Sequence, residues 1–81
     1  MDITSGGVVL VAANVLRVKL KVFNLSQEAI FVGKTGTAIA DMYPIQPNGS
    51  ETFGTDECAQ LEWSADITLG PGNARVLEFT Q

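Results

Sequence analysis

The chain of 81 residues is long enough for one small domain, and its content of 46% hydrophobic and 17% charged residues is typical of a globular fold. It contains no histidine and a single cysteine, Cys58. This composition excludes a disulfide within the chain, a zinc site of cysteine and histidine ligands, and proton transfer by histidine. Nine acidic and five basic side chains give a net charge of -4, so no nucleic-acid partner is expected.

The first residues, 1–7, are small or polar for the most part and predict a flexible arm before a single β domain at 8–81. This start lacks the basic segment of a secretion signal. The apolar run at 8–13 is much shorter than the roughly 20 residues of a membrane-spanning helix. We therefore expect a protein that is made in the cytoplasm and has no membrane partner.

Apolar residues recur mostly at every second position, which predicts β-strands. The first strand is expected at 8–12, and the clearest one covers 16–25. Its aliphatic face consists of Leu16, Val18, Leu20 and Val22, and its polar face consists of Arg17, Lys19, Lys21 and Phe23. A shift of one residue would bury the cations, so the register is well specified.

Further strands are expected at 30–32, 50–53, 60–65 and 74–79, with extended backbone at 37–42 and 67–69 and a tight turn at 70–73. Pro44 and Pro47 exclude a central strand between them, because proline lacks the backbone donor. Asn48 and Gly36 suit left-handed backbone in turns.

These elements predict an all-β chain, a single small antiparallel β-sandwich or jelly-roll-like barrel of six to eight short strands. The expected inner face comprises Leu16, Val18, Leu20, Val22, Ile30, Val32, Leu61 and Trp63.

Two local patterns suggest chemistry, but each has a simpler explanation. Gly33-Lys34-Thr35 is similar to the end of a phosphate-binding loop, yet Glu28 occupies the position where that loop needs glycine. The acidic pair Asp56 and Glu57 lacks the spacing of a calcium-binding loop. We expect no catalytic residue, no metal and no cofactor, and hence a protein that is not an enzyme.

The aromatic residues leave two interpretations open. Trp63, Tyr43 and Phe31 could stack on a sugar or a base, whereas the alternating strand around Trp63 favours a place in the core. Phe23 lies on the polar face of its strand, where it is either covered by a loop or presented to a partner.

The order of the motifs carries a resemblance. An Arg-x-x-Leu-x-Val-x-Asn strand is followed by a hydrophobic strand ending in glycine, a proline–glycine turn, a Leu-aromatic-Ala step and a closing strand. The residues in these motifs are Arg17, Leu20, Val22 and Asn24; Ile30, Phe31, Val32 and Gly33; Ile45, Pro47, Gly49 and Ser50; Leu61, Trp63 and Ala65; Val76 and Glu78. Over 8–79 the chain resembles the small β-sandwich structural proteins of tailed-bacteriophage virions, although Asn48 is inserted between Pro47 and Gly49.

The resemblance implies a capsid decoration (cement) protein that binds the outer surface of a bacteriophage head and stabilises it. Its partner would be the major capsid protein or another virion protein, its location the virion, and its state a homo-oligomer, with a trimer favoured. We expect docking through Arg17, Lys19, Lys21 and Phe23, and through Ile3 and Thr4 of the arm.

Three alternatives remain open at this point. One is a tail or head–tail connector accessory subunit. A second is a carbohydrate-binding or adhesion module that uses Trp63 and Tyr43. The third is a regulator that binds a host protein.

Overall fold

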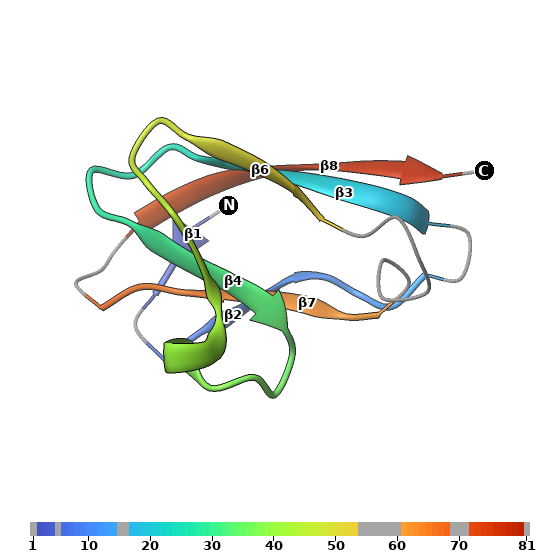
Figure 1. The fold of residues 1–81 in the computed structure, drawn as a ribbon, viewed down its shortest axis with the longest axis horizontal. Helices are drawn as coiled ribbons and strands as arrows, with labels where there is room; N and C mark the ends of the chain where they lie inside the picture. Colours follow the sequence, from blue (N-terminus) through green and yellow to red (C-terminus); the bar gives the residue numbers. More distant parts are fainter. Residues whose placement is uncertain (1, 5, 15–16, 54–60, 69–71, 81) are drawn as a thin grey trace.

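A computed structural model shows two four-stranded antiparallel sheets packed face to face (Figure 1). The structure describes residues 2–4, 6–14, 17–53, 61–68 and 72–80. Two residues singled out above, Leu16 and Cys58, and the acidic pair at 56–57 lie outside the described residues. The architecture confirms the expected all-β fold.

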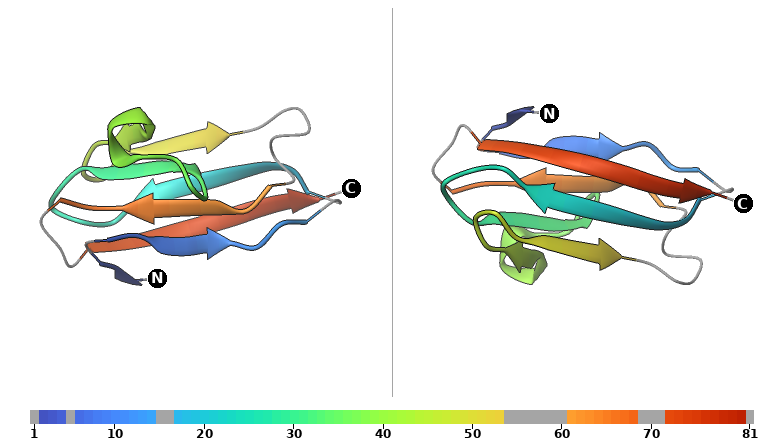
Figure 2. Two further views of the ribbon diagram at one scale, coloured as in Figure 1. Left: turned by 90° about the horizontal axis from the view of Figure 1, so that it is seen from below. Right: turned by 90° about the horizontal axis from the view of Figure 1, so that it is seen from above.

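The described residues form eight strands and one short 3-10 helix. In chain order these are β1 (Asp2–Ile3), β2 (Val8–Val11), β3 (Arg17–Asn24), β4 (Ile30–Lys34), η1 (Ile39–Asp41), β5 (Tyr43–Ile45), β6 (Ser50–Phe53), β7 (Trp63–Asp66) and β8 (Gly72–Thr80). The first sheet has the order β1-β8-β3-β6 and the second the order β2-β7-β4-β5. Figure 2 shows the long strands β3 and β8 side by side in the first sheet.

The core lies between the two sheets, where alternate residues of each strand point inward. Its buried hydrophobic residues are Ile3, Leu10, Val11, Leu20, Val22, Ile30, Val32, Ile45, Trp63, Ala65, Ile67 and Ala74. The predicted inner face is confirmed at Leu20, Val22, Ile30, Val32 and Trp63. It is wrong at Leu61, which is 43% exposed because it lies in a bend before β7. Leu16 and the side chain of Val18 lie outside the described part.

The start of the chain differs from the expected arm. Residues Asp2–Ile3 form the edge strand β1, in which Ile3 pairs with Gly72 of β8 and is completely buried. Ile3 is therefore part of the core and its side chain cannot contact a partner, whereas Thr4 is exposed. A strand of two residues is too short to produce an alternating pattern, so the sequence did not reveal it.

The turns and edge strands agree with the predictions from the sequence at some positions and differ at others. Asn48 and Gly36 have positive φ, at 63° and 95°, as expected. Pro44 is tolerated in β5 because β5 is an edge strand. The backbone expected to be extended at 37–42 instead contains η1, and the residues described in 67–69 are not in a strand. Strand β8 starts at Gly72, inside the predicted turn.

Candidate docking surface

The outer face of the first sheet carries a set of cations and apolar side chains. Antiparallel pairing of β3 with β8 places Lys19 opposite Phe79, Lys21 opposite Leu77 and Phe23 opposite Arg75. Since neighbouring residues on β3 and β8 supply the core, these six side chains point away from it. We call the six residues Lys19, Lys21, Phe23, Arg75, Leu77 and Phe79 the cationic–aromatic face.

Contacts within this face bring ammonium groups and rings together. The Nζ atom of Lys19 lies 4.8 Å from the centroid of the Phe79 ring, and that of Lys21 lies 5.1 Å from the Phe23 ring. Such cation–π contacts keep the long lysine side chains on the sheet surface. Leu77 and Phe79 nevertheless remain 45% and 37% exposed. The face thus offers apolar area and positive charge together, a combination suited to protein contacts.

The charge of this face is opposite to that of the whole chain. It contains three of the five basic residues of the sequence, although the net charge of the chain is -4. On the neighbouring strand β6, Ser50 lies opposite Phe23 and Thr52 lies opposite Lys21, so uncharged polar residues border the cations on this side. At the far margin β1 adds Asp2, which is exposed and pairs with Asn73. A partner with an acidic surface is favoured by this distribution.

Arg17 does not belong to the cationic–aromatic face, which corrects the expectation from the sequence. Its side chain is only 1% exposed. The pairing of β3 with β8 shifts between Arg17 and Lys19, and this β-bulge turns the Arg17 side chain toward the interior. Strict alternation, which the prediction assumed, would have placed it beside Lys19.

The buried guanidinium of Arg17 joins three segments at one end of the sandwich. Its Nε donates to Oε1 of Glu78 at 2.9 Å, and its Nη2 lies 2.9 Å from the same oxygen. Nη1 donates to the carbonyl of Leu61 at 2.9 Å, and Nη2 also donates to the carbonyl of Ala12. Arg17 therefore holds β8 and the segments before β3 and β7 together.

Asn24 has the corresponding role at the other end of β3, and no prediction had singled it out as a site. Its Nδ2 donates to the carbonyls of Glu28 and Ile45, both at 2.8 Å, and its Oδ1 accepts from the Ser26 N–H at 2.8 Å. The sequence indicates the inward direction of Asn24 through its spacing, because Asn24 continues the series of alternate residues that contains Leu20 and Val22. In the part of the chain that the structure describes, no buried side-chain nitrogen or oxygen lacks a hydrogen-bond partner.

The structure places the remaining residues of the docking prediction, and their role in docking stays a prediction. Lys19, Lys21 and Phe23 lie on one face, as their spacing predicts, and Phe23 is half-buried with the Lys21 ammonium over its ring. Arg75 and Phe79 were missed. Both faces of β8 carry apolar residues, so alternation alone could not assign its outer side.

A second aromatic group closes the opposite seam between the sheets. The rings of Tyr43 and Phe53 meet edge to face with centroids 5.7 Å apart, and those of Phe53 and Trp63 lie 5.0 Å apart. Trp63 is only 8% exposed, so it packs in the core and does not provide an open platform for a sugar. Tyr43 is half exposed, and its hydrogen bond to the Glu51 carboxylate raises the pKa of the phenol.

The other candidate sites receive ordinary structural roles. Gly33 and Lys34 lie in β4, and the next element is the short 3-10 helix η1 and not the long helix of a phosphate-binding loop. The Thr35 hydroxyl instead contacts the Ser64 hydroxyl, with the two oxygens 2.6 Å apart. Within the described ranges, no group of three or more acidic or cysteine side chains converges on a metal position. The described residues also contain no helix with the length and hydropathy to cross a bilayer.

Comparison with known proteins gives no match. No family model matches the sequence, and neither a curated protein nor a solved structure is significantly similar to it.

Proposed function

We propose that this chain is a structural protein of a tailed-bacteriophage virion, a decoration protein that docks on the outer surface of the head through its cationic–aromatic face. The observation that carries the proposal is the grouping of Lys19, Lys21 and Arg75 with exposed Leu77 and Phe79 on one sheet surface. The order of strand motifs described above, over 8–79, supplies the link to virion proteins.

The chemistry of the face indicates the chemistry of its partner. Three cations on a sheet surface favour an acidic counterpart, and the apolar side chains between them favour an apolar centre within it. On a capsid, the same acidic patch recurs at every symmetry-related position of the major capsid protein. Weak binding at each site then becomes strong through avidity wherever copies of the decoration protein are linked to one another.

The two buried polar residues of β3 prepare this face for binding. Arg17 and Asn24 anchor the ends of the strand that carries Lys19, Lys21 and Phe23. Because the strand is already held in place, docking does not have to order it, and less binding free energy is lost. The proposed role requires no catalytic group and no cofactor.

The alternative within the same class is a tail or head–tail connector accessory subunit. It would use the same face, so copy number separates the two: on the order of hundreds per particle for a head lattice, and about six or twelve for a ring at the tail. The carbohydrate-binding alternative would have to use Tyr43 without Trp63, because the latter is packed in the core.

The proposal is tested by mixing the purified protein with virus particles assembled without it. We expect co-sedimentation that saturates at a stoichiometry related to the capsid symmetry, weakens as salt is added, and raises the temperature at which the particles break. Absence of co-sedimentation at low salt would contradict the proposal. Equally strong binding to single-stranded DNA would contradict it too, because the face would then serve a different polyanion.

A further inference from the structure

The long strand β8 is an open edge of the first sheet over most of its length. One side of β8 pairs with β3 from Ala74 to Thr80, but its other side pairs with β1 only at Gly72 and Asn73. From Arg75 onward, no strand among the described residues covers this second side. Figure 2 shows β1 beside only the start of β8. An uncovered edge of this length is a template for another strand.

The hydrogen-bonding direction along β8 follows from its neighbours. The N–H of Leu25 donates to the carbonyl of Asn73 at 2.9 Å, so odd-numbered residues of β8 bond toward β3. Alternate residues of a strand direct their backbone groups to opposite sides. Val76 and Glu78 therefore direct their N–H and C=O groups toward the open edge.

We infer that this edge binds the same edge of a second copy of the chain. The two β8 strands pair antiparallel about a twofold axis, with Leu77 opposite Leu77 of the second copy. Val76 of each copy then lies opposite Glu78 of the other. These are the residues whose backbone groups point outward, so the pairs exchange hydrogen bonds without any change in the fold.

The side chains on the outer face are complementary in this register. Arg75 of one copy lies opposite Phe79 of the other, which brings a guanidinium beside an aromatic ring twice in the dimer. The exposed Leu77 side chains meet each other on the axis. The two Glu78 carboxylates become diagonal neighbours, but each already has its own Arg17 guanidinium at 2.9 Å. In this register the outer faces thus match cation with aromatic ring and leucine with leucine.

Neighbouring registers fit less well. A shift that centres the axis on Val76 would place Phe79 opposite Asn73 of the second copy, where β1 already pairs. A shift that centres it on Glu78 would place the two carboxylates directly opposite each other, which is unfavourable. Strand β1 thus excludes the register centred on Val76, and repulsion between the Glu78 carboxylates disfavours the register centred on Glu78.

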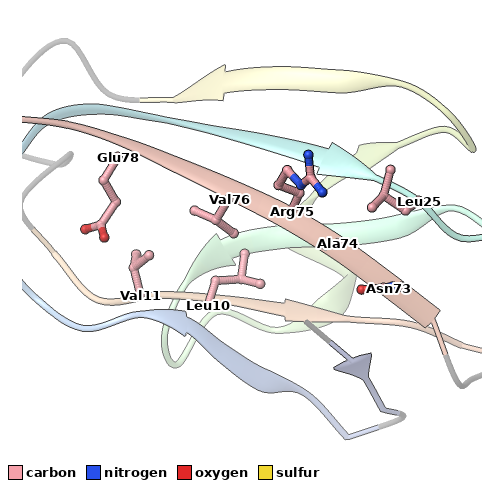
Figure 3. A pocket seen from close by; sticks show the side chains of 8 residues that line it. All are labelled: Leu10, Val11, Leu25, Asn73, Ala74, Arg75, Val76 and Glu78. Atoms are coloured by element: carbon pink, nitrogen blue, oxygen red, sulfur yellow. The ribbon is translucent and has the colours of Figure 1, made fainter.

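A groove beside the edge gives room for the added strand. It has a volume of about 420 Å³ and lies between β8 and β2 (Figure 3). Leu10 and Val11 extend from β2 into the gap, and Val76 and Glu78 border it on the β8 side (Figure 3). Inward-facing side chains of the second β8 therefore enter a space that has an apolar wall.

The pairing has a consequence for the outer surface. A twofold axis perpendicular to the extended sheet leaves both cationic–aromatic faces on the same side, so the dimer presents six cations in one plane. This arrangement is independent of what the face binds. It gives a dimer, whereas the sequence-based expectation favoured a trimer.

Sedimentation and disulfide trapping test the inference. Leu77→Cys in a Cys58→Ser background is expected to form a covalent dimer under mild oxidation, because directly opposite non-hydrogen-bonded residues suit a disulfide. Phe79→Cys in the same background is the matched control, since two such residues would be about 13 Å apart across the axis and would not crosslink. Crosslinking of Phe79→Cys but not Leu77→Cys, or a wild-type chain that sediments only as a monomer or as a trimer, would overturn the inference.

A charge substitution measures the strength of the same contact. Leu77→Lys places two ammonium groups opposite each other on the axis, so we expect the dimer dissociation constant to rise by about tenfold or more. Thr52→Lys adds the same charge on β6, at the opposite side of the sheet from the open edge of β8, and is expected to leave the dimer dissociation constant unchanged. Equal dissociation constants for the two variants, with native circular dichroism in both, would contradict pairing at Leu77.

Discussion

Each end of β3 carries a buried polar side chain, and the two side chains are stabilised by different hydrogen-bond partners. At one end the charged side chain of Arg17 is buried, and at the other end the neutral side chain of Asn24 is buried. Arg17 is satisfied by one carboxylate and two backbone carbonyls. Asn24 is satisfied by backbone groups alone.

The difference teaches where the fold is most sensitive. Arg17 is buried but its partner Glu78 is 41% exposed, so the cost of losing Arg17 comes from the large buried side chain and its charge-assisted hydrogen bonds. This cost exceeds that of losing a neutral hydrogen bond. The amide of Asn24 bonds to residues 2, 4 and 21 positions away along the chain, whereas Arg17 connects segments 44 and 61 residues away. We therefore expect the Arg17 end to be the more sensitive of the two.

The largest effect is expected for Arg17→Ala. It empties the space of a large buried side chain and leaves the carbonyls of Leu61 and Ala12 without their donors, so we expect a loss of about 3–5 kcal/mol in the free energy of unfolding. Urea unfolding followed by fluorescence of the single tryptophan measures it. Arg75→Ala removes an exposed arginine from the neighbouring strand and should change stability by less than about 0.5 kcal/mol. Similar losses for the two variants would refute the buried role of Arg17.

A smaller loss is expected for Asn24→Ala. The carbonyls of Glu28 and Ile45 would each lose a donor, and we expect about 2–3 kcal/mol of destabilisation in the same urea assay. Gln27→Ala changes an exposed amide in the same turn and serves as the control. If Asn24→Ala proved more destabilising than Arg17→Ala, the ranking of the two ends would be reversed.

The turn that packs against Asn24 should show a still smaller effect. Asn48 has φ of 63°, and its N–H donates to the carbonyl of Asn24 at 3.0 Å. Asn48→Ala is expected to cost about 1–2 kcal/mol, because alanine is strained in left-handed backbone. Asn48→Gly relieves this strain and should remain within about 0.5 kcal/mol of the wild type. Thermal unfolding compares the two variants, and equal losses would show that backbone strain is not the cause.

The smallest effect on stability is expected from the ionisation of Tyr43, which is the only tyrosine of the chain and lies away from both ends of β3. The Glu51 carboxylate raises the pKa of Tyr43 above its ordinary value of about 10. The folded state therefore keeps the phenol proton more tightly than the unfolded state. The associated stabilisation is present below about pH 10 and is lost as the pH rises through the higher pKa of the folded state. Ultraviolet absorbance of the phenolate measures the pKa, which Glu51→Gln should lower; an unchanged pKa would contradict the contact.

The sequence predicted most of the fold because the core strands alternate cleanly. Leu20 and Val22 in β3, and Ile30 and Val32 in β4, point inward as their spacing indicates. Alternation failed where the backbone departs from it. One extra residue in the bulge turned Arg17 inward, and a strand of two residues at Ile3 carried no pattern at all.

The composition of the cationic–aromatic face could be predicted in part for the same reason. Lys19, Lys21 and Phe23 belong to one strand, and their common side follows from spacing alone. Arg75 and Phe79 join them only through the pairing of β8 with β3, which no local pattern specifies. The structure also explains the spacing of the Arg-x-x-Leu-x-Val-x-Asn motif: the odd interval before Leu20 requires the bulge that buries Arg17.

Binding of charge-reversed variants to virus particles that lack this chain tests the central claim most directly. Lys19→Glu and Lys21→Glu reverse charges on the cationic–aromatic face, whereas Lys34→Glu makes the same change at an exposed position at the end of β4. We predict that each face variant binds the particles at least about tenfold more weakly than the wild type, and that Lys34→Glu binds like the wild type. Equal binding of all three variants would show that this surface is not the one that docks.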